Sequence, residues 1–274
     1  MRVRRPAVAG SFYPDDPAVL RASVARYIDE ARAVRGARGA SAAPKAIIVP
    51  HAGYEYSGAI AASGYAAVTH LAGMVKRVVL LGPAHRVAVD GLAVPSVDAF
   101  ATPLGPIEID DAARTIALGC GGVVVDDAAH AAEHSLEVHL PFLQHVLGPG
   151  FCVLPLVVGD ASPATVASVL DALWGGRETL IVVSSDLSHY EPYGVAREDD
   201  LRTAQAIING AFDAIGPYDA CGVRPVSGLL VAARRHDLDV QLLDLRNSGD
   251  TAGPAERVVG YGAFALSSSP AEAA

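Results

Sequence analysis

The chain has 274 residues, of which 51% are hydrophobic and 19% charged, and its formal net charge is −9. A domain of this size buries roughly three-quarters of its unfolded surface, so the fold needs no disulfide or structural metal. The acidic balance, without a basic stripe, argues against a nucleic-acid partner. No apolar run approaches the ~20 residues of a membrane span, and the start MRVRRPAVAG lacks the apolar core of a signal peptide. We therefore expect a soluble cytoplasmic protein that has neither nucleic acid nor membrane as a partner.

The cysteines are odd in number, widely spaced and set in apolar or Gly-rich surroundings. They are Cys120, Cys152 and Cys221. In a cytoplasmic protein this usage is typical of reduced core thiols. Because none of them follows a predicted strand together with a histidine, we expect all three to be free and to bind no metal.

The amino-terminal region combines an apolar extended segment with a helix. Residues 4–14 are too apolar to be free in solvent, so they must be held against the rest of the chain. Asp16 and Pro17 then predict a helix start, and the helix runs to about Ala33 with one buried stripe, Leu20, Val24 and Ile28. Residues 35–43 are small, Gly-rich and polar, which indicates an exposed loop.

A short apolar run at residues 46–49 is rich in β-branched side chains and bounded by prolines, which is typical of a buried strand. Pro50 cannot continue a strand ladder, so the strand must end just before His51. Ser57 is a candidate cap for a helix over residues 59–69. His51 is therefore expected at the carboxyl end of a strand, where open α/β sheets place their ligands.

The same layout recurs at residues 77–81, an apolar strand that is followed by His85. His85 lies 34 residues after His51, which is about the length of one strand–helix–strand unit. Neighbouring strands lie roughly 4.8 Å apart, so two imidazoles at their ends can converge on one point. Two further predicted strands, 179–183 and 240–245, also lead into polar residues. These are Asp186, His189, Asp250 and Thr251.

The remaining predicted elements alternate between strands and helices. The strands are 91–96, 107–109, 123–125, 152–158 and 257–266, and the helices are 111–118, 163–173, 196–212 and 225–235. This alternation predicts an α/β fold with a largely parallel central sheet flanked by helices. The strands at 91–96 and 107–109 are short enough to form a hairpin beside that sheet. We assign residues 1–266 to a single domain and residues 267–274 to a disordered tail.

Residues 131–147 form the densest ionisable cluster of the chain. Its members are Glu133, His134, Glu137, His139 and His145. They do not fit the zinc pattern of two histidines at i and i+4. Pro141 restricts the helix to a start near Glu137 or later. Two interpretations of His134 and His139 remain open: they line the pocket without binding metal, or they hydrogen-bond the sheet edge while His145 faces solvent.

Two histidines and a carboxylate with open positions form the facial triad of non-haem Fe(II) sites, and the same set can hold zinc with a catalytic water. A further histidine can act as general base. A serine nucleophile fits less well: Ser184, Ser185 and Ser188 lie near His189, but none stands in a G-x-S-x-G elbow.

Six ordered motifs, spread over residues 5–250, carry a resemblance to a known family. They are RPAVAGSFYP, VPHAGYEYSG, LLGPAH, EHSLEVHLPFL, SSDLSHY and NSGD. Together they closely resemble the Memo family, whose prokaryotic members are called AmmeMemoRadiSam system protein B. The resemblance implies a single α/β domain similar to the LigB-like catalytic subunits of class III extradiol dioxygenases.

By this resemblance His51 and His85 match the two metal histidines, and His189 matches the acid/base histidine. The dioxygenases use a carboxylate as third ligand and animal Memo proteins a cysteine. An ungapped match of NSGDT places Thr251 at the cysteine position, directly after Asp250.

We expect Asp250 to be the third ligand, because a threonine hydroxyl stays protonated at neutral pH. If Asp250 only caps its own turn, Asp186 becomes the alternative. Fe(II) is the expected metal, with copper or zinc as alternatives, and Asp186 with His189 is the expected catalytic pair. Four residues are expected to line the pocket, namely Tyr54, His134, His139 and Thr251. Tyr54 has the alternative of packing under the start of its helix.

Three functions follow as hypotheses. The first is a metal-dependent, dioxygenase-like oxidoreductase that acts on an unknown small substrate. The second is a binding or adaptor protein for a peptide or partner, and the resemblance implies AmmeMemoRadiSam system protein A and a radical SAM protein as companions. The third is a metal carrier without turnover.

Overall fold

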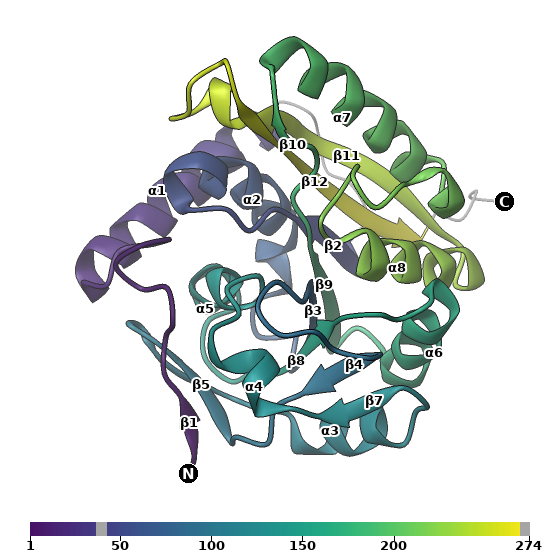
Figure 1. The fold of residues 1–274 in the computed structure, drawn as a ribbon. Helices are drawn as coiled ribbons and strands as arrows, with labels where there is room; N and C mark the ends of the chain where they lie inside the picture. Colours follow the sequence, from purple (N-terminus) through teal and green to yellow (C-terminus); the bar gives the residue numbers. More distant parts are fainter. Residues whose placement is uncertain (37–42, 269–274) are drawn as a thin grey trace, which may run out of the picture.

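The computed structural model describes residues 1–36 and 43–268, and these form a main sheet of nine strands (Figure 1). In spatial order the strands are β10 (His189–Glu191), β12 (Val258–Ser268), β2 (Ala46–Val49), β9 (Thr179–Ser184), β3 (Arg77–Pro83), β8 (Cys152–Val158), β4 (Leu92–Val94) and β7 (Val123–Val125), while β11 (Leu238–Asn247) also pairs with β12. The central strands β2, β9, β3 and β8 are parallel, and antiparallel strands flank them on both sides. The predicted α/β fold with a largely parallel centre is confirmed.

A small second sheet joins β1 (Val3–Arg4), β5 (Ala99–Thr102) and β6 (Gly105–Glu108). β5 and β6 form an antiparallel hairpin, and β1 runs parallel to β5. The expected hairpin therefore exists, but its partners differ from the prediction. The strand within residues 91–96 is β4, which joins the main sheet beside β8 because its three residues are all buried.

Helices cover both faces of the main sheet. The α-helices are α1 (Pro17–Gly36), α2 (Tyr54–Val68), α3 (Asp111–Leu118), α4 (Asp127–Ala131), α5 (Leu140–Leu147), α6 (Pro163–Leu173), α7 (Tyr193–Ile208) and α8 (Val223–Arg235), and the 3₁₀ turns are η1 (Thr69–Leu71), η2 (Glu137–His139), η3 (Phe212–Ala214) and η4 (Ser248–Asp250). α1, α2 and α5 share one core with one face of the sheet, and α3, α6, α7 and α8 share another core with the opposite face (Figure 1).

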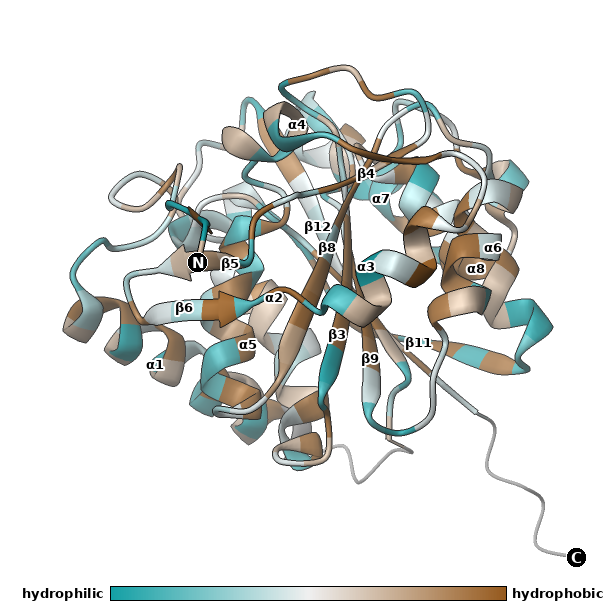
Figure 2. Cartoon of the chain, turned by 90° about the horizontal axis from the view of Figure 1, so that it is seen from below, coloured by the Kyte–Doolittle hydropathy of each residue, from teal (hydrophilic) through white to brown (hydrophobic). Residues whose placement is uncertain are grey.

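Alternation along the strands feeds these two cores. In β3, Val78 and Leu80 belong to the first core, whereas Val79 and Leu81 belong to the second. A strand with helices on both faces is apolar on both, which is why β8, and β3 after its first residue Arg77, are hydrophobic along most of their length (Figure 2). These two central strands therefore carry polar side chains only at their ends.

α1 begins at its predicted cap, whereas α2 begins before its predicted cap. The carboxylate of Asp16 accepts hydrogen bonds from the amides of Ala18 and Val19, so α1 starts as predicted. α2 begins at Tyr54, three residues before the predicted cap Ser57. The hydroxyl of Ser57 donates to the carbonyl of Ala52, so Ser57 does not cap the helix, and that prediction was wrong.

Other boundaries moved by a few residues. α1 extends to Gly36, two residues into the predicted loop, and α7 ends at Ile208 rather than Phe212. Ser267 and Ser268 end β12, because Ser267 pairs with Asp239 and Ser268 with Leu238, so the predicted tail begins too early. Residues 37–42 and 269–274 lie outside the described residues. Among the described residues, no helix combines the length and the apolar character that crossing a membrane requires.

The carboxylate of Glu137 anchors the amino-terminal segment, as its apolar sequence required. It accepts hydrogen bonds from Arg4 Nη1 at 2.6 Å, from the amides of Ala7 at 2.7 Å and Val8 at 3.0 Å, and from Tyr13 Oη at 2.6 Å. Glu137 is fully buried, and the side chain of Arg4 is 6% exposed. One buried charge pair thus fixes about ten residues of extended chain against the turn that precedes α5.

Candidate metal site

His51 stands two residues beyond β2, at the carboxyl end of the parallel strands. Its backbone amide donates to Asp186 Oδ1 at 2.8 Å, and its ring is 2% exposed. Ring atom Nδ1 lies 2.6 Å from Ser184 Oγ, and Nε2 lies 3.4 Å from Cys221 Sγ. Both nitrogens of this buried imidazole therefore have polar neighbours, one on the strand and one across the site.

His85 is held in the loop after β3 by Glu133. The carboxylate accepts from the His85 amide at 2.7 Å, and its other oxygen lies 3.0 Å from His85 Nδ1. It also accepts from the amides of His134 and Ser135. Burial alone would raise the pKa of Glu133, but the hydrogen bonds from His85 and Ser135 outweigh it and lower the pKa to about 2. An ionised carboxylate thus fixes the His85 ring by Nδ1 and leaves Nε2 for a ligand.

Three imidazoles meet at this point. The ring centroids of His51 and His85 lie 5.1 Å apart, those of His51 and His134 5.4 Å, and those of His85 and His134 4.8 Å. Burial lowers the pKa of His51 well below its usual range, and the neighbouring His85 and His134 lower it further. Burial also lowers the pKa of His134. Neutral imidazoles offer a lone pair, which is the form that binds metals.

Cys221 completes the cluster, so the premise that no cysteine lies with the histidines was wrong, whereas Cys120, Cys152 and Cys221 are all free, as expected. Its Sγ and one ring nitrogen each from His51 and His85 all lie within 4.8 Å of one another. Cys221 comes from the loop before α8, and Gly222 lets that loop approach β9. A Cβ at Gly222 would lie 2.6 Å from the carbonyl oxygen of Ser184. Burial raises the pKa of the Cys221 thiol, and the nearby Asp186 raises it further.

A second group of donor atoms, from His85, Glu133 and His134, also falls within 4.8 Å. The oxygens of Glu133 already accept hydrogen bonds from two histidines' amides, from Ser135 and from the ring of His85. A carboxylate that is occupied in this way orients its histidine rather than binding an ion. The group of His51, His85 and Cys221 is therefore the better metal site.

The structure does not bring Asp250 or Thr251 to the histidines. Asp250 Oδ2 accepts from the amide of Asn247 at 2.9 Å and Oδ1 from Tyr193 Oη at 2.6 Å, so the carboxylate caps the η4 turn. The single hydrogen of the Thr251 hydroxyl can be donated to the carbonyl oxygen of Tyr56 at 2.9 Å or to that of Ser248 at 3.1 Å. Both side chains are satisfied locally, and the cysteine that lies with the histidines is Cys221, 30 residues upstream of Thr251.

Asp186 lies beside the cluster, and His189 is near enough to influence the pKa of both His51 and Asp186. Asp186 Oδ2 is 3.9 Å from His51 Nε2, and the Asp186 amide donates to Cys221 Sγ at 3.3 Å. Burial raises the pKa of Asp186 above its usual range, while the hydrogen bond from His51 and the charge of His189 act in the opposite direction. Just after β9, Asp186 therefore contacts His51 through its carboxyl group and Cys221 through its backbone.

The other residues expected to line the pocket have different environments. His134 belongs to the cluster, and Phe12 packs against its ring with centroids 4.8 Å apart. His139 is buried behind His51, with Nε2 2.8 Å from Ser184 Oγ. Tyr54 is not at the rim: its ring packs against Phe142 and its hydroxyl donates to the carbonyl of Val138. For Tyr54 the alternative of packing under the helix start describes the structure.

Asp200 on α7 supports the segment that carries His189, and it allows a test of this environment. Its carboxylate accepts from the amide of Ser188 at 3.0 Å, and it is only 3% exposed. Burial raises the pKa of Asp200 from 3.8 to about 6. Between about pH 4 and pH 6 the folded state therefore keeps a proton on Asp200 that the unfolded state releases. The contribution of Asp200 to the protein's free energy of unfolding falls as the pH rises through this range and is constant above it.

For Asp200→Asn, which keeps an oxygen acceptor but cannot ionise, we expect this pH-dependent term to vanish. Relative to the variant, the wild-type protein should lose about 3 kcal/mol between pH 4 and pH 6. Urea unfolding in the presence of a chelator, at half-unit pH steps, measures the difference. Parallel curves for the two proteins would show that Asp200 titrates normally.

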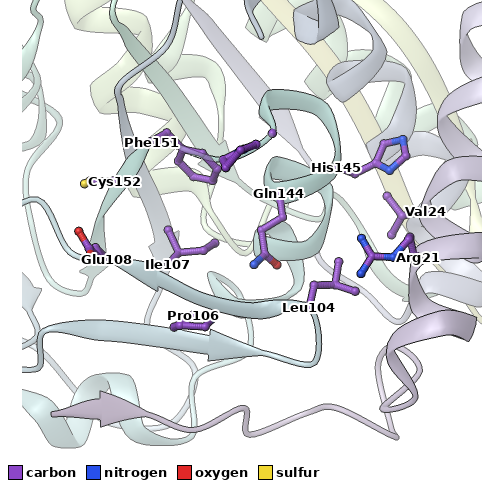
Figure 3. Close-up of a pocket in the computed structure, with 13 residues that line it drawn as sticks. Arg21, Val24, Leu104, Pro106, Ile107, Glu108, Gln144, His145, Phe151 and Cys152 are labelled. Atoms are coloured by element: carbon purple, nitrogen blue, oxygen red, sulfur yellow. The ribbon is translucent and has the colours of Figure 1, made fainter. Parts of the chain in front are cut away.

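A cavity of about 700 Å³ lies at the other end of β8 (Figure 3). Arg21, Ile107, His145 and Cys152 are among its lining residues, and Cys152 is the first residue of β8. The opposite end of that strand, Val158, pairs with Pro83 two residues before His85. The cavity and the histidine cluster are therefore at opposite ends of the sheet, and the exposed His145 belongs to the cavity.

Comparison with known proteins places the chain in a family. A family model described as "Memo-like protein" matches residues 4–265. The chain is 34% identical to a MEMO1 family protein of Methanopyrus kandleri, with 95% of this chain and 98% of the relative covered. It is 37% identical to one of Ignicoccus hospitalis, with 96% and 98% covered, and 36% identical to one of Methanosarcina barkeri, with 96% and 99% covered.

A solved structure is similar in fold. The crystal structure of an uncharacterized protein from Escherichia coli K12 matches with a TM-score of 0.51 at 12% identity, covering 79% of this chain and 98% of that one. The matches to the three MEMO1 family proteins cover almost the full length of this chain and of each relative. They confirm the resemblance that the motifs carried. The chain belongs to the Memo family.

Proposed function

We propose that this chain binds one divalent transition-metal ion through His51, His85 and Cys221 and uses it in redox chemistry on a small molecule. The observation that supports this most directly is the meeting of three donor atoms from three distant segments within 4.8 Å. Imidazole and thiolate ligands suit iron, zinc and copper, whereas magnesium and calcium prefer oxygen ligands. Three protein ligands leave coordination positions open for a substrate. Fe(II) is the ion we propose, with zinc and copper as competitors.

The surroundings of the donors fit a bound ion. His51 Nδ1 is occupied by Ser184 and His85 Nδ1 by Glu133, so each ring has a fixed orientation and a second nitrogen left for the ion. Histidines that bind metals usually have such a partner on the other nitrogen. Cys221 is a neutral thiol in the metal-free protein, because burial raises its pKa, so metal binding should release its proton.

A bound ion would supply Lewis-acid and one-electron redox chemistry. Asp186 and His189 are the residues that we propose to hold or move protons at the substrate. Burial favours the protonated form of Asp186, so its carboxyl group can donate a proton at Oδ2, the oxygen nearest His51 Nε2. The ring of Phe12 packs against His134 and helps to exclude water from that side of the site.

The test is the metal content of protein purified without chelator, followed by anaerobic titration with Fe(II). We expect one ion per chain, and loss of binding in His51→Ala and in His85→Ala. His145→Ala is the matched control, because His145 is an exposed histidine at the opposite end of the sheet. Oxygen consumption by the loaded protein then tests redox turnover.

Other outcomes would contradict the proposal. Equal binding by the wild type and both variants, or no binding at all, would refute the site. Stoichiometric binding without oxygen consumption would indicate a metal carrier. Affinity for a peptide, for system protein A or for a radical SAM companion that survives both His→Ala substitutions would support an adaptor instead.

A further inference from the structure

The hydroxyl of Ser184, at the carboxyl end of β9, has three polar neighbours. The carbonyl oxygen of Ser135 lies 2.6 Å away, His51 Nδ1 2.6 Å away and His139 Nε2 2.8 Å away. All four residues are buried, so no solvent replaces any of these contacts. A hydroxyl has one hydrogen to donate and two lone pairs that accept.

The chemistry of the neighbours decides which of them receives that hydrogen. A carbonyl oxygen can only accept, so the Ser184 hydroxyl must donate to Ser135. Its two lone pairs then face His51 Nδ1 and His139 Nε2, and both of these nitrogens must carry hydrogen to make a bond. A neutral imidazole has one N–H, so the other nitrogen of each ring is bare.

We propose that Ser184 is a positioning residue that fixes His51 in its Nδ1–H tautomer and so directs the Nε2 lone pair towards Cys221. The inference rests on the proposed function, in which that lone pair is a metal ligand. Ser184 thus orients this ligand atom already in the metal-free protein. Ser184 contacts His51 at Nδ1, whereas the atom proposed as the ligand is Nε2, so Ser184 acts through the ring and is not itself a ligand.

One contact and one unpartnered atom agree with this assignment. Cys221 Sγ lies 3.4 Å from His51 Nε2, and a thiol can donate there only if Nε2 is bare. His139 Nδ1 is buried and has no hydrogen-bond partner among the described residues. With Nε2–H donating to Ser184, this unpartnered atom is a bare acceptor, whereas the opposite tautomer would bury an unsatisfied N–H, the rarer defect in proteins.

The first test needs no variant. Ring ¹⁵N NMR of the metal-free wild-type protein distinguishes protonated from bare nitrogens, and His51→Asn and His139→Asn serve only to assign the signals. We expect hydrogen on Nδ1 of His51 and on Nε2 of His139, each in one tautomer. Hydrogen on Nε2 of His51, or a mixture of tautomers, would overturn the proposal.

The second test removes the hydroxyl. For Ser184→Ala we expect mixed His51 tautomers in the metal-free protein and an affinity for Fe(II) or Zn(II) that is about 10–100-fold weaker, the usual effect of losing such a partner. Ser188→Ala is the matched control, since Ser188 is also buried but its hydroxyl makes no hydrogen bond to His51 or His139. Its affinity and its His51 tautomer should equal those of the wild type.

The outcomes separate this inference from the proposed function. If Ser184→Ala folds and binds metal like the wild type, the positioning role is refuted while the metal site stands. If the wild type shows the expected tautomers but binds no ion, the tautomer assignment stands and the proposed function fails. If Ser184→Ala does not fold, the wild-type spectrum still decides the tautomer.

Discussion

The Cys221→Ser variant is expected to lose tight metal binding. A serine hydroxyl stays protonated at neutral pH and is a poor ligand, so the ion would keep only two imidazoles. Removing a true ligand should weaken binding by more than the ~10–100-fold that follows the loss of a surrounding partner. Fe(II) and Zn(II) titrations of the purified variant, monitored by calorimetry with released protons counted, measure the change.

Two comparisons make the result specific. Cys152→Ser, at the start of β8 and at the other end of the sheet, should bind like the wild type. Asp250→Asn should also bind like the wild type, because that carboxylate caps its own turn. If Cys221→Ser binds normally while Asp186→Asn does not, the third ligand is Asp186 and the assignment of Cys221 is wrong.

Strand patterns in the sequence predicted that His51 and His85 lie in the site, but they gave no such prediction for Cys221. His51 and His85 follow apolar runs bounded by prolines or glycine, so strand patterning alone places them at one edge of a parallel sheet. Cys221 precedes a helix that packs on the sheet, and helix packing is not visible in strand periodicity. The signal that was available is Gly222, a residue without a side chain at the point where the loop approaches β9.

Asp250 and Glu133 show the same limit for carboxylates. Both are next to a predicted site residue in sequence, and the pattern of residue types cannot distinguish a ligand from a cap. The carboxylate of Asp250 caps the η4 turn, whereas the carboxylate of Glu133 accepts a hydrogen bond from the amide of His85. Which of these two roles a carboxylate has depends on the backbone amides within hydrogen-bond distance. For Glu133, the amide of His85 belongs to a segment that is distant in sequence and that only the fold brings close.

The amino-terminal segment contributes to the site through hydrogen bonds of Arg4. Arg4 Nη2 donates to the carbonyl oxygen of Glu133 at 2.8 Å, and Arg4 Nε donates to that of His130 at 2.7 Å. Its third contact is the carboxylate of Glu137. The residue that pairs with Glu137 therefore also fixes the backbone of Glu133, the residue that orients His85. The buried charge pair links the first strand of the chain to the histidine cluster.

Glu137→Gln is accordingly expected to be strongly destabilising. It leaves the buried guanidinium of Arg4 without a counter-charge, and loss of one partner of a buried pair typically costs about 3–5 kcal/mol in free energy of unfolding. Glu30→Gln is the matched control, because Glu30 pairs with Arg26 on the surface, where the two side chains are 57% and 56% exposed. That exposed pair should contribute less than about 1 kcal/mol. Urea unfolding of the metal-free proteins, monitored by circular dichroism, measures both values.

The double variant Arg4→Met/Glu137→Gln separates charge from hydrogen bonding. Glu137 also accepts from the amides of Ala7 and Val8 and from the hydroxyl of Tyr13, and glutamine retains only one oxygen for these three donors. If the unpaired charge causes most of the loss, removing it should restore a large part of the stability. If the double variant is as unstable as Glu137→Gln, the unsatisfied donors dominate instead. Similar small losses for Glu137→Gln and Glu30→Gln would show that the buried pair does not hold the segment at all.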